Sequence, residues 1–384
     1  MSGHSVRNAA GPMRAVLPAL GALLLLTAAV APTGAEGGPT PTGPPDAAAA
    51  PLGTLPEQPA EMWRTAPGGT KGRVSTPDSR AAQLVPFDGE AWRRFHAGAL
   101  PRYGSLAIGG MLALLIAFYL ARGRIRIEHG WAGRTLTRFG AWERFCHWLL
   151  ALSFLALALT GLNILYGRYT LLPLLGAERF AALSQAGTWL HNSVGFTFML
   201  ALLLTAITWM PQNLGGWRDI VWLVKGGGLF VRGSHPPAWK FNAGQKLLFW
   251  LVVLGGASLS LSGIALLLPI QFPLFAKMFA LLNMAGYQLP TALTPVQEMQ
   301  YAASWHGIIA LALISVVIAH IYIGTLGMQG AFSAVGSGEV DVNWAREHHS
   351  LWAEQELERM ERVAAAVTEA AREATPEPIE QGRG

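Results

Sequence analysis

Five long apolar runs constrain this chain more than any other feature of its sequence. They lie at about 104–121, 146–166, 190–210, 247–268 and 303–327. Each is close to the ~20 residues that a helix needs to cross a hydrocarbon layer of ~30 Å. Backbone polar groups in lipid must be bonded within their own segment, so these runs predict transmembrane helices and exclude a strand-rich fold. Only 13% of the residues are charged, against ~25% in a typical soluble protein.

The chain before the first run carries an export signal. Arg7 and Arg14 precede an apolar stretch, and Ala29-Val30-Ala31 matches a small-residue cleavage site, so residues 1–31 are predicted to be a secretory signal peptide. An uncleaved anchor helix is the alternative, although the stretch is short for a span. Residues 32–103 are rich in Pro, Gly and Ala, which predicts a flexible periplasmic tether.

Basic residues are concentrated in two of the four loops between the spans. These are Arg122, Arg124, Arg126, Arg134, Arg138 and Arg144 in the first loop, and Arg218, Lys225, Arg232, Lys240 and Lys246 in the third. The other two loops hold only Arg168, Arg179 and Lys277. The positive-inside rule places the basic loops in the cytoplasm of a bacterial inner membrane, with the N-terminus periplasmic and the C-terminus cytoplasmic. The net charge of +5 therefore reflects topology, and no nucleic-acid partner is expected.

The single cysteine, Cys146, limits the redox chemistry that is open to the chain. It excludes an internal disulfide, an iron–sulfur cluster held by this chain's own thiolates and a c-type haem attachment. Any redox centre must therefore rely on histidines.

The tail, residues 331–384, alternates acidic and basic residues from Trp344 onward and is predicted to be a solvated cytoplasmic helix.

Four of the ten histidines lie in or at the edge of predicted spans: His147, His191, His306 and His320. An ionisable side chain in the bilayer is a functional-site hypothesis by default, and the alternative for any single one is a hydrogen bond to a neighbouring helix. The other six, His4, His96, His129, His235, His348 and His349, fall in the leader, tether, loops or tail and are expected to be solvated.

The positions of the four histidines pair them by depth. His306 and His320 are 14 residues apart, which on a helix places them within about 40° of one face and roughly 21 Å apart along the axis. His147 begins a helix that leaves the cytoplasm, and His191 begins one that enters from the periplasm. His147 should therefore face His320, and His191 should face His306. Two opposed imidazoles make a bis-histidine haem site, and two such sites stacked across the bilayer would form an electron wire. Small residues beside them, Gly195, Gly307 and Gly324, would leave room for a porphyrin.

At this point the sequence resembles a known family, the gamma subunit of respiratory formate dehydrogenases, which is a membrane cytochrome b. The matching stretches are Glu143-Arg144-Phe145-Cys146-His147-Trp148, Leu190-His191, Lys240-Phe241-Asn242-Ala243-Gly244-Gln245-Lys246, Leu261-Ser262-Gly263, and His306 through His320-Ile321-Tyr322 to His348-His349. The resemblance implies an all-α membrane protein: a four-helix transmembrane dihaem cytochrome b bundle at 140–330, plus one extra N-terminal transmembrane helix at 104–121 that the shorter members lack.

The resemblance also implies cofactors and partners. His147, His191, His306 and His320 would be the axial ligands of two b haems, and Asn242, Gly244 and Gln245 would line a menaquinone or ubiquinone pocket beside His320. From the residues alone, Asn242 is better explained as a helix N-cap, a common use of asparagine, and the two roles could coexist. The expected partners are an iron–sulfur beta subunit and a molybdenum- or tungsten-pterin alpha subunit, because this chain cannot oxidise formate alone.

Two alternatives remain open at the level of sequence. The four histidines would also suit the cytochrome b subunit of a nickel–iron hydrogenase or of a thiosulfate reductase. From a different class, a haem-free membrane scaffold or transporter could use the histidines for packing or proton relay.

Overall fold

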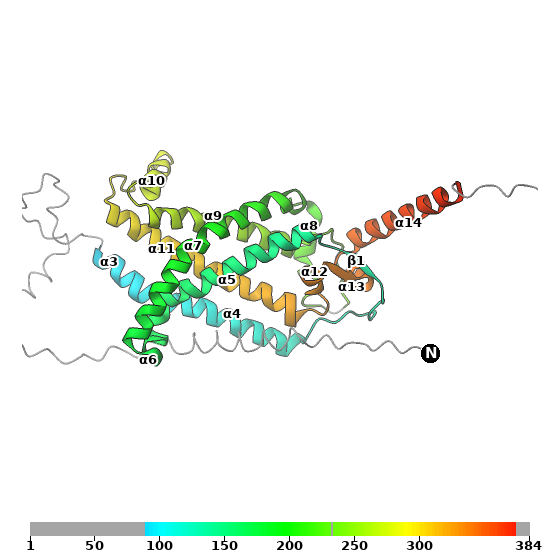
Figure 1. Cartoon of the computed structure of the whole chain (residues 1–384), viewed down its shortest axis with the longest axis horizontal. Helices are drawn as coiled ribbons and strands as arrows, with labels where there is room; N and C mark the ends of the chain where they lie inside the picture. Colours follow the sequence, from blue (N-terminus) through cyan, green and yellow to red (C-terminus); the bar gives the residue numbers. More distant parts are fainter. Residues whose placement is uncertain (1–88, 232, 374–384) are drawn as a thin grey trace, which may run out of the picture.

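The computed structural model describes residues 89–231 and 233–373, which are largely helical (Figure 1). Five helical segments are long and apolar enough to cross a membrane: Ala91–Arg122, Ala141–Thr170, Leu172–Asn213, Ala243–Leu267 and Pro295–Gly327. They coincide with the five predicted spans, so the prediction of a multi-pass helical protein is confirmed. The predicted signal peptide, and the predicted tether as far as residue 88, lie outside the described residues.

Short turns and small helices connect the long ones. In chain order the elements are α3 (Gly89–Arg94), η1 (Phe95–Ala99), α4 (Leu100–Arg122), β1 (Thr135–Thr137), α5 (Ala141–Thr170), α6 (Leu172–Leu175), α7 (Ala177–Trp209), η2 (Met210–Asn213), α8 (Trp217–Val224), η3 (Gly226–Gly228), α9 (Ala243–Leu267), α10 (Leu274–Met284), α11 (Pro295–Tyr322), η4 (Ile323–Gly327), α12 (Ser333–Gly336), β2 (Glu339–Asp341), α13 (Val342–His348) and α14 (Ser350–Glu373). We call the end of the bundle with β1, β2 and α13 the tail end.

The first helix begins earlier than its apolar run suggests. The sequence placed the end of the tether at 103 and the start of the helix at 104, whereas α3, η1 and α4 continue from Gly89 to Arg122. The predicted boundary is therefore wrong. Hydropathy marks only the apolar part of a helix, while polar residues with good helix propensity, such as Arg93 and Arg94, extend it. One turn of this extension, η1, is a π-helix.

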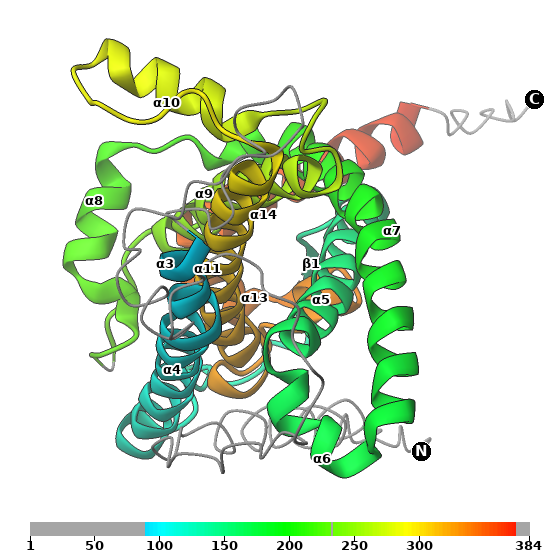
Figure 2. The same cartoon turned by 90° about the vertical axis from the view of Figure 1, so that its left-hand side faces the viewer.

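Helices α5, α7, α9 and α11 pack in sequence, and α4 lies against α11 on the outside (Figure 2). Ile108 and Leu112 of α4 are buried against Leu311 in one apolar cluster. Lipid is as apolar as these side chains, so the contact depends on close packing rather than on removal from water. A Cβ at Gly104 would lie 2.5 Å from the Tyr166 hydroxyl oxygen, so this glycine sets how closely α4 approaches.

The tail folds back onto the first basic loop and covers the tail end of the bundle. Strand β1 pairs antiparallel with β2, with Leu136 opposite Val340. Trp344 and Trp352 are buried in a core that includes Phe139. The prediction of a solvated tail is therefore wrong for residues up to Ala353 and agrees with the structure only in the exposed remainder of α14. The charge alternation masked apolar residues whose partners lie some 200 positions earlier in the chain.

The docked tail should be sensitive to acid. His348 and His349 were expected to be solvated, yet burial lowers the pKa of His348 to about 4 and that of His349 well below its ordinary value. An undocked tail binds protons below pH ~6.5 that the docked tail does not, so docking weakens as the pH falls from there. At pH 5.5, about one unit below the ordinary histidine pKa, each imidazole destabilises the docked tail by an amount on the order of 1 kcal/mol.

Hydrogen exchange of the amides in β2 and α13, compared at pH 7.5 and 5.5 after correction for intrinsic rates, measures this effect. Amides in the middle of α9 serve as the internal control and should keep their protection. His349→Gln should remove part of the pH dependence, whereas protection of β2 that is independent of pH would contradict the argument.

Candidate functional site

Two pairs of histidines face one another inside the bundle, in the combination that the sequence analysis proposed. The ring centres of His147 on α5 and His320 on α11 are 6.3 Å apart. Those of His191 on α7 and His306 on α11 are 6.2 Å apart. We call the first the inner pair, because it lies nearer the tail end, and the second the outer pair. Three helices thus contribute the four rings, and α11 contributes one ring to each pair.

The separation within each pair fits a metal ion between the rings. A metal–imidazole nitrogen bond is about 2.0 Å long. The nitrogen lies about 1.1 Å from the centre of a five-membered ring with bonds of ~1.35 Å. Two imidazoles on opposite sides of one iron therefore have centres about 6.2 Å apart. The ring-centre distances of both pairs therefore match the spacing of two imidazole ligands on one metal ion.

The outer pair is oriented by two hydroxyl groups. Thr160 Oγ1 lies 2.8 Å from His191 Nδ1, and Ser262 Oγ lies 3.0 Å from His306 Nδ1. Each hydroxyl also donates its hydrogen to a backbone carbonyl one turn earlier in its own helix, at 2.7 Å to Ala156 O and 2.9 Å to Ser258 O. Each hydroxyl oxygen must then accept a hydrogen from the imidazole, so both rings carry hydrogen on Nδ1 and keep Nε2 free as a metal ligand.

A cavity of about 400 Å³ surrounds the outer pair, within the range of about 300–1,000 Å³ usual for cofactor sites. Gly161 follows Thr160, and Gly263 follows Ser262. A Cβ at Gly161 would lie 3.5 Å from the His191 ring, and a Cβ at Gly263 would lie 3.7 Å from the His306 ring. Gly195 faces open space, as expected for a residue beside a porphyrin. Gly307 also lines the cavity, but its Cβ would meet Leu100 of α4 at 2.8 Å, so it serves helix packing as well.

His96 also lines this cavity, although the sequence analysis assigned it to a solvated tether. It lies on the π-helical turn η1 and stacks on Trp92, with ring centres 4.8 Å apart. The correction follows from the early start of the first helix, which brings this residue into the bundle. A π-helical turn is frequent at functional positions in membrane and soluble proteins alike.

The inner pair has different surroundings. His147 Nδ1 is buried and has no hydrogen-bond partner among the described residues. The His147 ring contacts Trp148 and Trp209, with centres 5.4 and 6.5 Å away. Gly324, four residues after His320, faces open space. The structure therefore supplies hydroxyl partners to the outer imidazoles but shows none for His147.

The three candidate quinone residues lie in the first turn of α9. Asn242 is the N-cap: its Oδ1 accepts from the Gln245 backbone N–H at 3.0 Å, and Gln245 Oε1 accepts from the Asn242 backbone N–H at 3.2 Å. The N-cap alternative from the sequence analysis thus holds for Asn242. Both amide oxygens are used, which leaves the side-chain NH₂ groups as donors. A Cβ at Gly244 would lie 3.2 Å from the Trp222 ring, so this glycine lets α8 approach.

Arg138 is a buried residue that sequence reasoning treated only as a topology marker. It donates through Nη2 to Gln245 Oε1 at 3.2 Å and to Lys240 O at 2.7 Å. Its guanidinium lies over the rings of Phe139 and Trp344. Burial lowers the pKa of Arg138 to about 9. Nε and Nη1 have no hydrogen-bond partner among the described residues, so two strong donors remain unused beside the candidate quinone residues.

A chain of aromatic contacts connects this region with the inner pair. The Trp209 ring centre is 6.5 Å from that of His147 and 5.6 Å from that of Phe241, the residue before Asn242. Trp209 Nε1 donates to Glu143 Oε1, which also accepts from Lys240 Nζ at 2.7 Å. The candidate quinone residues and the inner pair thus belong to one packed unit at the tail end.

Sequence reasoning missed Thr160 and Ser262 as partners of the outer histidines. The signal that could have found them is a hydroxyl residue followed by glycine, which occurs as Thr160-Gly161 on α5 and as Ser262-Gly263 on α9. The first residue bonds the imidazole and the second leaves space for it. Serine and threonine are common in membrane helices, so the pattern gains meaning only beside a histidine.

Removal of the Thr160 or Ser262 hydroxyl should weaken the binding of a metal cofactor at the outer pair. Thr160→Val and Ser262→Ala each delete the acceptor for an Nδ1 hydrogen, and loss of such a partner typically costs 10–100-fold in metal affinity. We expect lower haem retention at the outer pair and a changed midpoint potential, measured by redox titration of the visible spectrum. Ser315→Ala is the matched control, because Leu311 O is the only hydrogen-bond partner of Ser315 Oγ among the described residues. Unchanged retention and potential in both variants would show that the hydroxyls do not orient the ligands.

Comparison with known proteins identifies related sequences. The model of the prokaryotic cytochrome b561 family matches residues 138–337, a region that contains both histidine pairs. The formate dehydrogenase cytochrome b556(fdo) subunit of Escherichia coli (strain K12) is 28% identical over 231 residues, which is 60% of this chain and 97% of that protein. The nitrate-inducible cytochrome b556(Fdn) subunit of the same strain is 26% identical over 221 residues, covering 57% and 90%. A formate dehydrogenase cytochrome b556 subunit of Haemophilus influenzae is 26% identical over 218 residues, covering 56% and 80%.

Proposed function

The chain belongs to the prokaryotic cytochrome b561 family, and on that premise we propose that it is the membrane-anchoring cytochrome b subunit of a respiratory formate dehydrogenase. In this proposal it passes electrons from a periplasmic iron–sulfur subunit through two b haems to quinone at the cytoplasmic side. A bis-histidine haem supplies one-electron transfer without binding a substrate. The names of the relatives support the formate dehydrogenase assignment.

The strongest support for this proposal is the spacing of the rings within the two histidine pairs. Two histidine pairs, at 6.2 and 6.3 Å, each have the spacing of two ligands on one iron. They share α11, and the positions of His306 and His320 on it separate the pairs by roughly 21 Å along the bundle. A packing or proton-relay role for histidines gives no reason for this spacing to occur twice. The arrangement supports a four-helix dihaem bundle of α5, α7, α9 and α11, with α4 added outside it.

The charge of the loops supports an orientation for this bundle. The basic loops that precede α5 and α9 lie at the tail end, and the positive-inside rule puts them in the cytoplasm of a bacterial inner membrane. The N-terminus is then periplasmic and the tail cytoplasmic. The outer pair faces the periplasmic partners, and the inner pair lies near the cytoplasm.

The residues at the tail end suit quinone binding. The side-chain NH₂ groups of Asn242 and Gln245 are donors left over from capping α9, and a quinone carbonyl is an acceptor. Arg138 holds Gln245 in place through its oxygen. Protons for quinone reduction would then come from the cytoplasm. With formate oxidised outside, turnover would move charge across the membrane, worth about 2.3 kcal/mol per charge per 100 mV.

The proposal requires partner subunits. The single cysteine cannot hold an iron–sulfur cluster, so the electrons must arrive from another chain. We propose an iron–sulfur beta subunit as the direct donor and a molybdenum- or tungsten-pterin alpha subunit as the site of formate oxidation. This chain is then an electron-transfer subunit that is not catalytic toward formate alone.

The experiment that tests the function is capture of the tagged chain from native membranes, followed by mass spectrometry and a visible spectrum. We expect two b haems per chain, co-purified alpha and beta subunits, and reduction of both haems by formate. Reduction by hydrogen and not by formate would assign the chain to a hydrogenase. A preparation without b-type absorbance would overturn the proposal in favour of a haem-free scaffold or transporter.

A further inference from the structure

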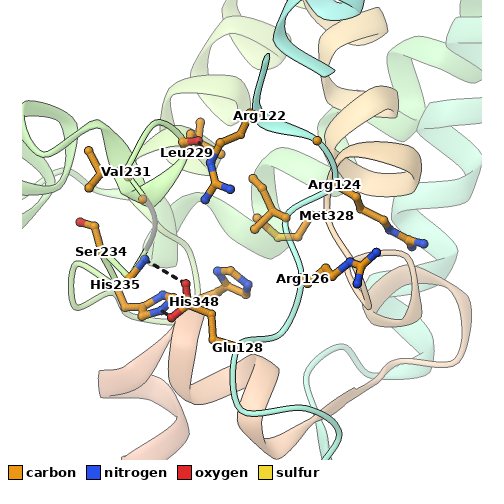
Figure 3. Close-up of a pocket in the computed structure, with 15 residues that line it drawn as sticks. Arg122, Arg124, Arg126, Glu128, Leu229, Val231, Ser234, His235, Met328 and His348 are labelled. Atoms are coloured by element: carbon orange, nitrogen blue, oxygen red, sulfur yellow. Dashed lines mark hydrogen bonds and ion pairs between the residues drawn. The ribbon is translucent and has the colours of Figure 1, made fainter. Parts of the chain in front are cut away.

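A second cavity lies at the tail end of the bundle, apart from both histidine pairs. Its volume is about 440 Å³, and three segments that are distant in sequence enclose it (Figure 3). One wall is formed by residues of the segment 122–128 at the end of α4, the opposite wall by residues of 227–231 and 233–235 after α8, and Met328 and His348 complete the lining. The segment 122–128 precedes the region that the family model matches, so this cavity depends on a part of the chain outside that match.

The wall of this cavity carries an excess of positive charge. Arg122, Arg124 and Arg126 line it, and among the described residues no carboxylate forms an ion pair with any of them. Glu128 is the acidic residue of the lining. Its two oxygens are already used, accepting from His235 Nε2 at 3.0 Å and from the Gly233 backbone N–H at 2.9 Å. The pocket is therefore suited to an anion.

Two of the side chains that line the cavity carry nitrogen atoms for which the described residues offer no hydrogen-bond partner. Arg122 Nε donates to Leu229 O at 3.1 Å, which holds the guanidinium at the cavity wall, and its Nη groups have no hydrogen-bond partner among the described residues (Figure 3). His348 Nε2 is buried on the opposite side and has no hydrogen-bond partner among the described residues. Burial of an unpaired polar atom costs free energy, so the arrangement favours a ligand with several acceptor oxygens between these groups.

The neighbouring segment indicates where such a ligand would come from. Helix α8 runs across the bundle axis (Figure 2) and exposes Trp217, Ile220 and Val224 on one face. Phe230 and Val231 after it are also largely exposed, at 70% and 59%, and Val231 lines the cavity. Apolar residues on a helix that lies across the spans are typical of a segment in the headgroup region of a bilayer. Such a position of α8 would place the cavity at the level of the lipid phosphates.

From these observations we propose that the cavity binds the phosphate group of an anionic phospholipid. Arg122 and His348 contact the phosphate oxygens, and the charges of Arg124 and Arg126, whose guanidinium groups point away from these two residues (Figure 3), add longer-range attraction. Leu229, Val231 and Met328 supply an apolar side toward the lipid. The lipid would add to the contacts between the segment after α4 and the docked tail, which already meet where Glu347 accepts hydrogen bonds from the backbone N–H groups of Glu128 and His129. This binding does not depend on haem, formate or electron transfer.

The test uses the full-length complex in mild detergent, offered phosphatidylglycerol or phosphatidylcholine, with bound lipid counted by native mass spectrometry. Inorganic phosphate in excess is a third arm, because a free anion shares the same chemistry. The wild-type chain should retain phosphatidylglycerol selectively, with no displacement by phosphate. Arg122→Gln should weaken that retention about fivefold or more, the change expected from one basic residue at a lipid headgroup.

Two further variants separate the site from general effects. Arg134→Gln removes the same charge from an exposed residue of the same loop outside the cavity and should leave retention unchanged. Arg122→Lys keeps a charge that can bind phosphate and should retain most of the lipid, which shows that the fold tolerates substitution. Equal loss in the Arg134 variant, or no loss in the Arg122→Gln variant, overturns the proposal. Displacement of phosphatidylglycerol by inorganic phosphate overturns the lipid assignment in favour of a small anion.

Discussion

Replacement of His320 by alanine is expected to abolish haem binding at the inner pair and quinone reduction with it. His147 alone cannot hold a six-coordinate iron, and His320 is the ring that faces it at 6.3 Å. The outer pair, roughly 21 Å away along α11, should keep its haem and remain reducible by formate. Haem content should fall from two per chain to one, with quinone reduction at background, as measured by haem extraction and by formate-reduced spectra.

Two companion variants make this result interpretable. His320→Met supplies a thioether, which ligates haem iron in other cytochromes and raises the potential, so haem should be retained with a higher midpoint. Ser315 lies on the same helix, and within the described part of the chain its hydroxyl bonds only to Leu311 O, so Ser315→Ala should keep both haems. If both haems survive in His320→Ala, the assignment of the inner pair is wrong.

Replacement of His306 by alanine should have an equally large effect, in this case on the outer pair. The outer haem is lost, and Ser262 then has no imidazole to accept from. Formate-dependent reduction of the inner haem should fall to background, because the donor faces a gap of roughly 21 Å to the next centre. Quinol added to membranes should still reduce the inner haem from the cytoplasmic side.

This asymmetry distinguishes a broken electron path from a misfolded chain. Stopped-flow spectra with formate and with quinol as alternative reductants measure it. His306→Ala should respond to quinol only, and His320→Ala should respond to formate only. Turnover from formate to quinone within about twofold of the wild type in His306→Ala would mean that electrons bypass the outer pair.

The spans and the histidine pairs were accessible from the sequence for a simple reason. Apolar runs of about twenty residues have one stable outcome in lipid, and the periodicity of a helix fixes the relative direction of His306 and His320 without knowledge of the fold. The alternation of spans then sets the depth of His147 and His191. The structure brings together the pairs that this reasoning selected.

Other parts of the site depend on contacts that no local pattern encodes. Hydropathy missed the polar start of the first helix, and so it placed His96 in the tether instead of the cavity wall. The capping role of Asn242 was foreseen as an alternative, whereas the support of Gln245 by Arg138 was not. The charge pattern of the tail hid the burial of Trp344.

The sequence by itself determined that this chain forms five helices long and apolar enough to cross a membrane and that its imidazoles face one another in two pairs, because both follow from the length and the periodicity of single helices. Only the tertiary structure decided which hydroxyl bonds each outer imidazole, how the tail docks, and that Arg122 and His348 enclose one cavity. Those features join residues from different helices or from segments some 200 positions apart. Their proximity is set by the packing of the helices against one another, and one-dimensional patterns do not contain it.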